Sequence, residues 1–173
     1  PSDHTMIAWL AGTMAQMPGP KYIRLDKGAF PPLYRDDTDF GKGVAAVRPG
    51  RDVTIVATGV MVHRAVRIAE ELEKYSVEAA VVDCYRLKPV NEDALLEAVG
   101  ADSRVVTLEE NSIVGGLGSL VCEVLADRGR SLPVKRLALA DQFRFELGSR
   151  EKLQAIDGLD VAQVCKAILE FRG

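Results

Sequence analysis

Apolar strand-like runs alternate with amphipathic stretches over most of this chain, and this alternation restricts the possible folds more than any other feature of the sequence. The segment Asp52–Gly59 is rich in β-branched residues and ends in glycine, which predicts a buried strand. Apolar residues then recur at helical spacing from Val62 to Leu72, with charged residues between them, which predicts a helix packed on one face.

The same pattern continues toward the carboxyl end. Asn91 is a suitable N-cap for a short helix, because its side chain can accept a hydrogen bond from a free backbone amide. Strands are expected over Val77–Tyr85, 104–110 and Val134–Asp141, and closing helices around Arg150–Ala155 and Val161–Phe171. Near-continuous apolar strands that alternate with helices predict an α/β fold with a mostly parallel, doubly wound sheet.

A Pro-Gly turn precedes this unit. The sequence RPGR, residues 48–51, lies between two strand-like stretches and could join them as an antiparallel hairpin. We therefore expect one antiparallel edge strand in the sheet.

The first thirty residues do not fit the same domain. Residues 3–17 are helix-like, with Asp3 as a possible N-cap, and GPKYIRL, residues 19–25, is strand-like. One helix and one strand bury too little surface to stand alone. We interpret 1–30 as the end of another domain, 31–42 as a linker and 43–173 as the α/β domain, in a chain cut from a longer one.

Composition excludes several classes of protein. The 173 residues are 47% hydrophobic and 27% charged with a net charge of -3, so neither disorder nor a nucleic-acid partner is expected. No apolar run reaches the ~20 residues of a membrane span, and no signal peptide is recognised. Three scattered cysteines without CxxC spacing predict reduced core thiols in a cytoplasmic protein: Cys84, Cys122 and Cys165.

A glycine-rich turn, IVGGLG at residues 113–118, joins a predicted strand to a predicted helix, as in many phosphate-binding loops. It matches only half of the dinucleotide fingerprint, because Val121 stands where a third glycine or alanine is needed after Gly116 and Gly118. Two interpretations stay open: an anion at the helix N-terminus, or glycines that let the strand turn tightly into a closely packed helix. An independent nucleotide-binding domain is the corresponding functional alternative.

Four blocks of sequence together resemble the carboxy-terminal part of the thiamine diphosphate-dependent transketolase superfamily. They are DVTIVATGVMVHRAVRIAEEL, VVDCYRLKPVNEDALLEAV, VVTLEENSIVGGLGSLVCEVL and LALADQF, in the order and at the spacings of that family. The opening helix and GPKYIRLDKG resemble the end of the family's pyrimidine-binding domain. The transketolase and deoxyxylulose phosphate synthase types fit better than the β-subunits of 2-oxoacid dehydrogenases, which remain an alternative.

This resemblance implies a transferase of two-carbon units in which the cofactor carries the chemistry. In the family, thiamine diphosphate and Mg²⁺ are held by regions upstream of this segment, and so are the catalytic residues. The segment is therefore expected to bind no cofactor or metal, to hold no catalytic residue and to be inactive alone. Its expected partners are the rest of the same enzyme or a separate N-terminal subunit, a second copy in a homodimer, and a sugar phosphate or pyruvate-type substrate.

The resemblance also nominates a substrate contact. The family carries an arginine at the end of the last pyrimidine-domain strand that grips a sugar phosphate, and the matching position here is Lys27. Lysine supplies a point charge without the bidentate fork of arginine. Arg24 is a second candidate, but it would not share a face with Lys27 on a regular strand. Alternatively, Arg24 and Asp26 form a surface or interdomain pair.

The remaining polar candidates end the third strand of the α/β domain. Glu109, Glu110 and Asn111 lie where α/β proteins place ligands, so acid–base or metal chemistry is one possibility. We favour a capping role or contacts with another domain or subunit. His4 and His63, the two histidines of the chain, lack a partner at recognisable spacing and are expected to be solvated or structural.

Overall fold

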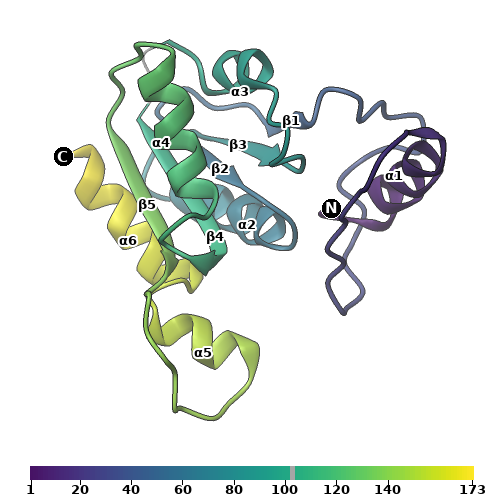
Figure 1. Cartoon of the computed structure of the whole chain (residues 1–173). Coiled ribbons are helices and arrows are strands. Elements are labelled where there is room, and N and C mark those ends of the chain that lie inside the picture. Colours follow the sequence, from purple (N-terminus) through teal and green to yellow (C-terminus); the bar gives the residue numbers. More distant parts are fainter. Residues whose placement is uncertain (102–103) are drawn as a thin grey trace.

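The computed structural model describes residues 1–101 and 104–173, and over this range a five-stranded sheet lies between two layers of helices (Figure 1). The strand order is β1-β3-β2-β4-β5. The strands are β1 Val44–Arg48, β2 Val53–Ala57, β3 Ala79–Cys84, β4 Val105–Ser112 and β5 Val134–Leu139. Strands β3, β2, β4 and β5 pair in parallel and β1 runs antiparallel to β3, which confirms the predicted fold class.

The partner of the antiparallel strand was predicted wrongly. Strand β1 pairs with β3 rather than forming a hairpin with β2, because β3 and β4 occupy both edges of β2. The turn between β1 and β2 instead crosses over the start of β3. A Cβ on Gly50 would lie 2.1 Å from the backbone nitrogen of Ala80, so only glycine fits this crossing.

Two apolar layers cover the sheet, as the alternation of strands and helices predicts. Helices α2 (Met61–Glu73) and α6 (Val161–Arg172) pack on one face, around Ile55, Ile68 and Ile168. Helices α3 (Glu92–Val99) and α4 (Leu117–Asp127) pack on the other face. Strands β2 and β3 are buried along their whole length, because an apolar cluster covers each face of the sheet.

A short helix, α5 (Arg150–Ile156), follows β5 and lies at the carboxyl edge of the sheet, at the lower end of the molecule in Figure 1. Ser149 caps it by accepting a hydrogen bond from the amide of Lys152 at 3.3 Å. The loop that precedes α5 extends beyond the body of the domain (Figure 1).

The N-terminal segment contains α1 (His4–Gln16), which lies apart from the sheet (Figure 1). Asp3 caps this helix, as predicted, with Oδ1 accepting from the amide of Met6 at 2.9 Å. The predicted strand at residues 19–25 is absent, and the chain is irregular between α1 and β1 among the described residues. A single extended stretch forms a strand only against another strand, and none lies beside it here. The domain boundaries near residues 30 and 42 remain a prediction.

Within the described ranges, the structure has no helix that is both long enough and apolar enough to cross a lipid bilayer.

Candidate functional site

A carboxylate of the α/β domain, that of Glu109, caps the N-terminus of α4 beside the glycine-rich turn between β4 and α4. The side chain of Glu109 is fully buried. Its Oε2 accepts a hydrogen bond from the amide of Leu117 at 2.7 Å, and its Oε1 accepts from the amide of Gly118 at 2.8 Å. These amides are the first free donors of α4, so Glu109 supplies the negative charge that a helix N-terminus attracts.

The glycines of this turn allow the close packing. A Cβ on Gly116 would lie 2.1 Å from Oε2 of Glu109, and a Cβ on Gly118 would lie 2.8 Å from Oγ1 of Thr107. Gly115 has a φ of +72°, a conformation that favours glycine. The turn therefore fits the second of the two interpretations above. An external phosphate would have to displace Glu109 from these amides, which removes the main support for a nucleotide-binding domain.

The three polar residues at the end of β4 lie in an irregularity of the sheet. The pairing with β5 shifts between Leu108, which faces Leu137, and Ser112, which faces Leu139. Glu109, Glu110 and Asn111 therefore leave the regular alternation of a strand. Their side chains make separate contacts: with α4, with α5 and with the N-terminal segment, respectively.

Arg150 joins two carboxylates at the carboxyl edge of the sheet. Its Nε and Nη2 each lie 2.6 Å from a carboxylate oxygen of Glu110, and its Nη1 and Nη2 lie 2.9 and 2.6 Å from the carboxylate of Asp26. Gln154 also donates to Glu110. The hydrogen bond from Arg150 lowers the pKa of Asp26, and the bonds to Asp26 and then Glu110 raise the pKa of Arg150.

Sequence reasoning missed Arg150, because nothing near it in the chain marks a site. It opens α5, 40 residues after Glu110 and 124 residues after Asp26. Only the return of the chain from β5 to the same edge brings the three side chains together.

The two predicted substrate contacts have different surroundings. Nη1 of Arg24 donates to Oδ1 of Asn111 at 3.1 Å, so Arg24 and Asp26 both contact the α/β domain. The alternative considered above was a pair formed by Arg24 with Asp26, whereas here each residue has its own partner in the α/β domain. Lys27 is exposed at the following turn, where its backbone amide donates to Asp26 at 3.0 Å. A phosphate-binding role of Lys27 or Arg24 remains a prediction.

A buried carboxyl group at the end of β3 forms a second junction with the N-terminal segment. Asp83 is fully buried, and its Oδ2 accepts hydrogen bonds from Oγ of Ser2 at 2.7 Å and from the hydroxyl of Tyr34 at 2.8 Å. Burial raises the pKa of Asp83 to about 6, although both hydrogen bonds oppose the rise. The sequence signal of this site is weak, a charged residue inside the otherwise apolar strand VVDCY.

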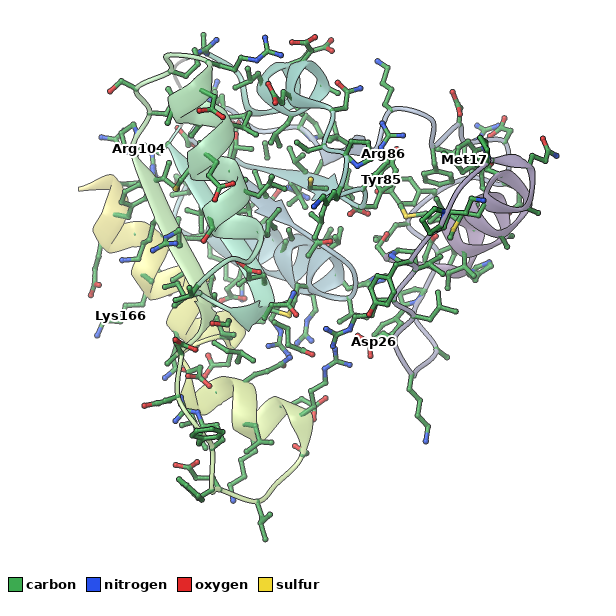
Figure 2. The ribbon with its side chains drawn as sticks, viewed as in Figure 1. Met17, Asp26, Tyr85, Arg86, Arg104 and Lys166 are labelled. Atoms are coloured by element: carbon green, nitrogen blue, oxygen red, sulfur yellow. The ribbon has the colours of Figure 1, made fainter. Side chains whose placement is uncertain are left out.

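Asp3 and an aromatic cluster complete this junction. Besides capping α1, Asp3 accepts from the amides of Leu33 at 2.8 Å and Tyr34 at 3.2 Å. The buried ring of Phe40 makes edge-to-face contacts with three aromatic rings, from α1, from the irregular segment and from the end of β3: Trp9, Tyr34 and Tyr85. Tyr85 is labelled beside this junction in Figure 2.

His63 has a structural role at the same junction. Its Nε2 lies 2.7 Å from the carbonyl oxygen of Ser2, and its ring stacks on Phe30 with centroids 5.2 Å apart. His4 opens α1 and is exposed. Among the described residues, neither histidine approaches a nucleophile or carboxylate in the manner of a general base.

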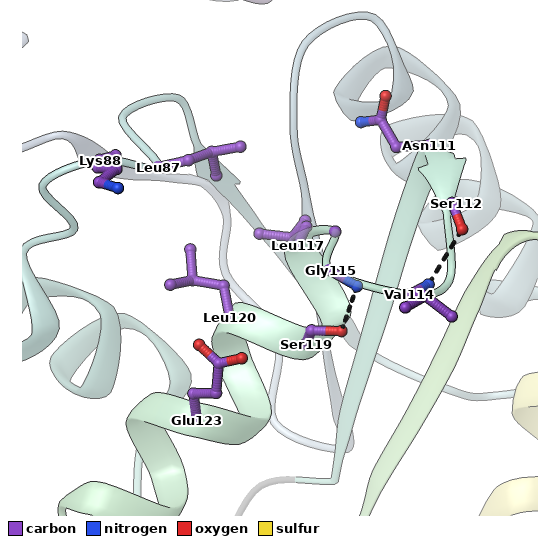
Figure 3. Close-up of a pocket in the computed structure, with 11 residues that line it drawn as sticks. Leu87, Lys88, Asn111, Ser112, Val114, Gly115, Leu117, Ser119, Leu120 and Glu123 are labelled. Carbon is purple, nitrogen blue, oxygen red and sulfur yellow. Dashed lines mark hydrogen bonds between the residues drawn. The ribbon is translucent and has the colours of Figure 1, made fainter.

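A pocket of about 610 Å³ opens at the carboxyl ends of β3 and β4 (Figure 3). Leu117, Leu120 and Leu87 form its apolar part, while Lys88, Asn111 and Glu123 bring polar groups to its rim. Ser119 also lines the pocket, and its hydroxyl accepts a hydrogen bond from the amide of Gly115 at 3.0 Å (Figure 3).

Metal ligation is not indicated for the described part of the chain, and two of the three cysteines, Cys84 and Cys165, are buried, whereas Cys122 is partly buried. No group of three or more His, Cys, Asp or Glu side chains within it could hold a metal ion. Burial raises the pKa of Cys84 to about 12 and that of Cys165 to about 11, so both thiols stay protonated and unreactive at neutral pH.

Comparison with known proteins identifies the family. The family model described as "Transketolase, C-terminal domain" matches residues 42–164. Over 173 aligned residues the chain is 33% identical to one of the subunits of the apulose-4-phosphate transketolase of Phocaeicola vulgatus, covering 99% of this chain and 54% of that protein. It is 34% identical to the 1-deoxy-D-xylulose-5-phosphate synthase of Dechloromonas aromatica, covering 97% of this chain and 27% of that protein.

A solved structure agrees over almost the whole chain. A split gene transketolase, described as an inactive beta4 tetramer, superposes with a TM-score of 0.88 at 34% identity, covering 99% of this chain and 56% of that one. The chain thus spans about half the length of the transketolase subunits that it matches, and about a quarter of the synthase. The match to the family model, the sheet order and the shared structure lead to one conclusion: this chain belongs to the transketolase C-terminal domain family.

Proposed function

We propose that this chain is the C-terminal part of a thiamine diphosphate-dependent transferase of two-carbon units, of the transketolase or 1-deoxyxylulose-5-phosphate synthase type. It supports assembly of the enzyme and borders the substrate channel. The family and the names of the relatives above support this assignment. The whole enzyme carries the activity, and the segment is inactive alone.

One observation supports the proposed contact with substrate, namely the way in which residues 24–28 are attached to the α/β domain. Arg24 and Asp26 attach residues 24–28 to the end of β4 and the start of α5, through Asn111 and Arg150, respectively. This attachment leaves Lys27 exposed at a fixed turn, where its ammonium group can meet the phosphate of a sugar phosphate as a point charge. Arg24 is the second candidate for this contact, and would exchange its bond with Asn111 for one with the phosphate.

The cofactor is proposed to bind elsewhere in the enzyme. A diphosphate with Mg²⁺ requires oxygen ligands and free amides, whereas the described residues offer no cluster that could hold a metal ion. The amides at the start of α4 are bonded to Glu109. The described residues therefore do not fit the diphosphate and Mg²⁺, which we assign to the rest of the enzyme.

The partners follow from the same proposal. The rest of the enzyme either precedes this segment in one polypeptide or is a separately encoded subunit, and the split gene transketolase favours the second arrangement. A homodimer, a sugar phosphate or pyruvate-type substrate and a cytoplasmic location complete the proposal. Glu110 and Asn111 are expected to lie at contacts with another domain or subunit.

The test uses the complete enzyme with thiamine diphosphate and Mg²⁺ and a panel of ketose phosphates and pyruvate. Lys27→Ala should raise KM for the phosphorylated substrate about tenfold with a smaller change in kcat, since it removes one charge contact. Lys27→Arg should preserve or improve KM. Lys166→Ala, on α6 and away from Asp26 in Figure 2, is the matched control. Absence of cofactor-dependent activity on every substrate of the panel would refute the proposal.

A ligand screen on the chain alone distinguishes the nucleotide-binding alternative. We expect no thermal shift with NAD, FAD or ATP, because Glu109 occupies the amides that a phosphate would use. A saturable shift with one of these, lost in Gly118→Ala, would favour the alternative.

A further inference from the structure

A carboxylate lies next to the residue that is proposed to meet the substrate phosphate. Oδ1 of Asp26 accepts a hydrogen bond from the amide of Lys27 at 3.0 Å, so both residues belong to one turn. The hydrogen bond from Arg150 lowers the pKa of Asp26, so this carboxyl group is ionised at neutral pH. A free carboxylate here would attract the ammonium group of Lys27 and repel a phosphate.

The guanidinium of Arg150 binds this carboxylate through both of its oxygens. Nη1 donates to Oδ1 of Asp26 at 2.9 Å and Nη2 donates to Oδ2 at 2.6 Å, the bidentate geometry that is strongest for an arginine and a carboxylate. Lys27 is exposed, and among the described residues its ammonium group forms no ion pair. The negative charge of Asp26 is thus balanced by Arg150 and not by Lys27.

The charges at this edge of the sheet leave a small positive excess. Arg24, Lys27 and Arg150 bring three positive charges, and Asp26 and Glu110 bring two negative charges, which gives a net charge of +1. Without Arg150 the net charge would be zero. The carboxylate of Asp26 would then have Lys27 as the next cation along the chain.

We propose that Arg150 is a positioning residue for the phosphate of the substrate: by binding Asp26, it keeps the ammonium group of Lys27 free for that phosphate. Arg150 acts through Asp26 and does not touch the substrate. This inference rests on the proposed function for the contact between Lys27 and phosphate. A purely structural role of Arg150 is less suited to the geometry, because Arg24 attaches the same turn to Asn111 independently at 3.1 Å.

Calorimetric titration of the complete enzyme with fructose 6-phosphate tests the proposal. Thiamine diphosphate is left out, so that binding is measured without turnover. Arg150→Ala should weaken binding about fivefold, the size of one exposed ion pair, because Asp26 then competes for Lys27. Arg128→Ala is the matched control, since Arg128 also pairs with two carboxylates, those of Glu92 and Asp93, and it should leave binding unchanged.

Two further variants separate this role from a structural one. In an Asp26→Asn background, Arg150→Ala should no longer weaken binding, because no carboxylate is released. Arg150→Lys should keep most of the affinity, because lysine also balances the charge of Asp26. A loss that persists in the Asp26→Asn background would mean that Arg150 binds the phosphate itself or acts through Glu110, and the inference would be wrong.

Lys27→Ala distinguishes failure of this inference from failure of the proposed function. It should weaken binding of fructose 6-phosphate more than Arg150→Ala does, and Arg150→Ala should add no further loss to it. If Lys27→Ala weakens binding and Arg150→Ala does not, only the role of Arg150 is refuted. If Lys27→Ala has no effect, or if the complete enzyme does not bind the sugar phosphate, the contact of Lys27 and the role of Arg150 are refuted together.

Discussion

Different interactions stabilise the α/β domain and the N-terminal segment of this protein. The domain buries whole strands between two layers of helices, with β2 and β3 inaccessible along their length. The N-terminal segment, residues 1–42, buries few side chains, among them Met6 and Phe40. Its contacts with the domain are mostly polar or aromatic and include those of Asp83, Arg150, Asn111 and His63 and one aromatic cluster.

Because of this difference, we expect unfolding of the whole molecule and local opening of the N-terminal segment to have different free energies. Burial of apolar surface is the main term in folding, so the α/β domain should determine the free energy of unfolding of the molecule. A segment held by a few polar contacts can open on its own at lower cost. We therefore expect the N-terminal segment to detach from a folded domain, and four predictions test that expectation, from the largest effect to the smallest.

Removal of a core side chain of the domain should have the largest effect. Ile55 is fully buried in the central strand, so Ile55→Ala should lower the free energy of unfolding by about 4 kcal/mol. Urea denaturation followed by circular dichroism measures this. Met6→Ala, equally buried but in α1, is the matched variant and should change the global value far less. Equal losses for both variants would show that the two regions unfold as one.

Ionisation of Asp83 should have the second-largest effect on stability. Its pKa in the folded protein is raised from 3.8 to about 6. The folded state therefore binds a proton more tightly than the unfolded state, and the favourable contribution, complete below about pH 4, is lost as pH rises through 6. The loss amounts to about 3 kcal/mol.

The measurement is hydrogen exchange of the α1 amides between pH 4 and pH 7, corrected for the intrinsic pH dependence of exchange. Protection of α1 should fall over that range in the native chain and stay level in Asp83→Asn. A native chain without this fall would mean that Asp83 does not control the attachment of the segment.

Loss of the Glu109 carboxylate, which caps α4, should have the third-largest effect on stability. Glu109→Ala leaves the amides of Leu117 and Gly118 buried without an acceptor, so it should cost about 2 kcal/mol. Only the stability of the α/β domain should fall: the midpoint of urea denaturation should be lower, and hydrogen exchange of the α1 amides should be unchanged. Increased exchange in α1 would instead mean that the cap also supports the junction.

Loss of the exposed bridge should have the smallest effect. Arg150→Ala removes partly exposed ion pairs with Asp26 and Glu110 and should cost under about 1 kcal/mol globally. Limited proteolysis should nevertheless become faster within residues 19–28. Arg35→Ala, at an exposed pair with Asp37, is the control and should change neither quantity. A large global loss for Arg150→Ala would contradict the division between the two regions.

Local sequence signals predicted a large part of the fold. The N-caps Asp3 and Asn91 were recognisable because each is a short polar side chain at the start of an apolar helical pattern, and both accept the expected amide. The close strand-to-helix turn at Gly116 followed from its glycines. The same reasoning failed at residues 19–25, since strand propensity has no effect without a neighbouring strand.

The site was less predictable than the fold. Lys27, Arg24 and the three residues at the end of β4 were identified from the family resemblance or from their position, but their partners were not. Asp83 looked like one polar residue in a strand, and Arg150 like one more charge at a helix start. Both act through residues more than 30 positions away, and one sequence contains no record of such contacts.

By itself, the sequence determined the α/β class, the order of helices and strands within the α/β domain and the family, because hydrophobic periodicity and local motifs are properties of neighbouring residues. Only the tertiary structure decided that β1 joins β3 rather than β2, that Glu109 fills the helix N-terminus and that Arg150 binds Asp26. These outcomes depend on which edges and charges remain available once the core has packed, and packing brings together groups that are far apart in the chain.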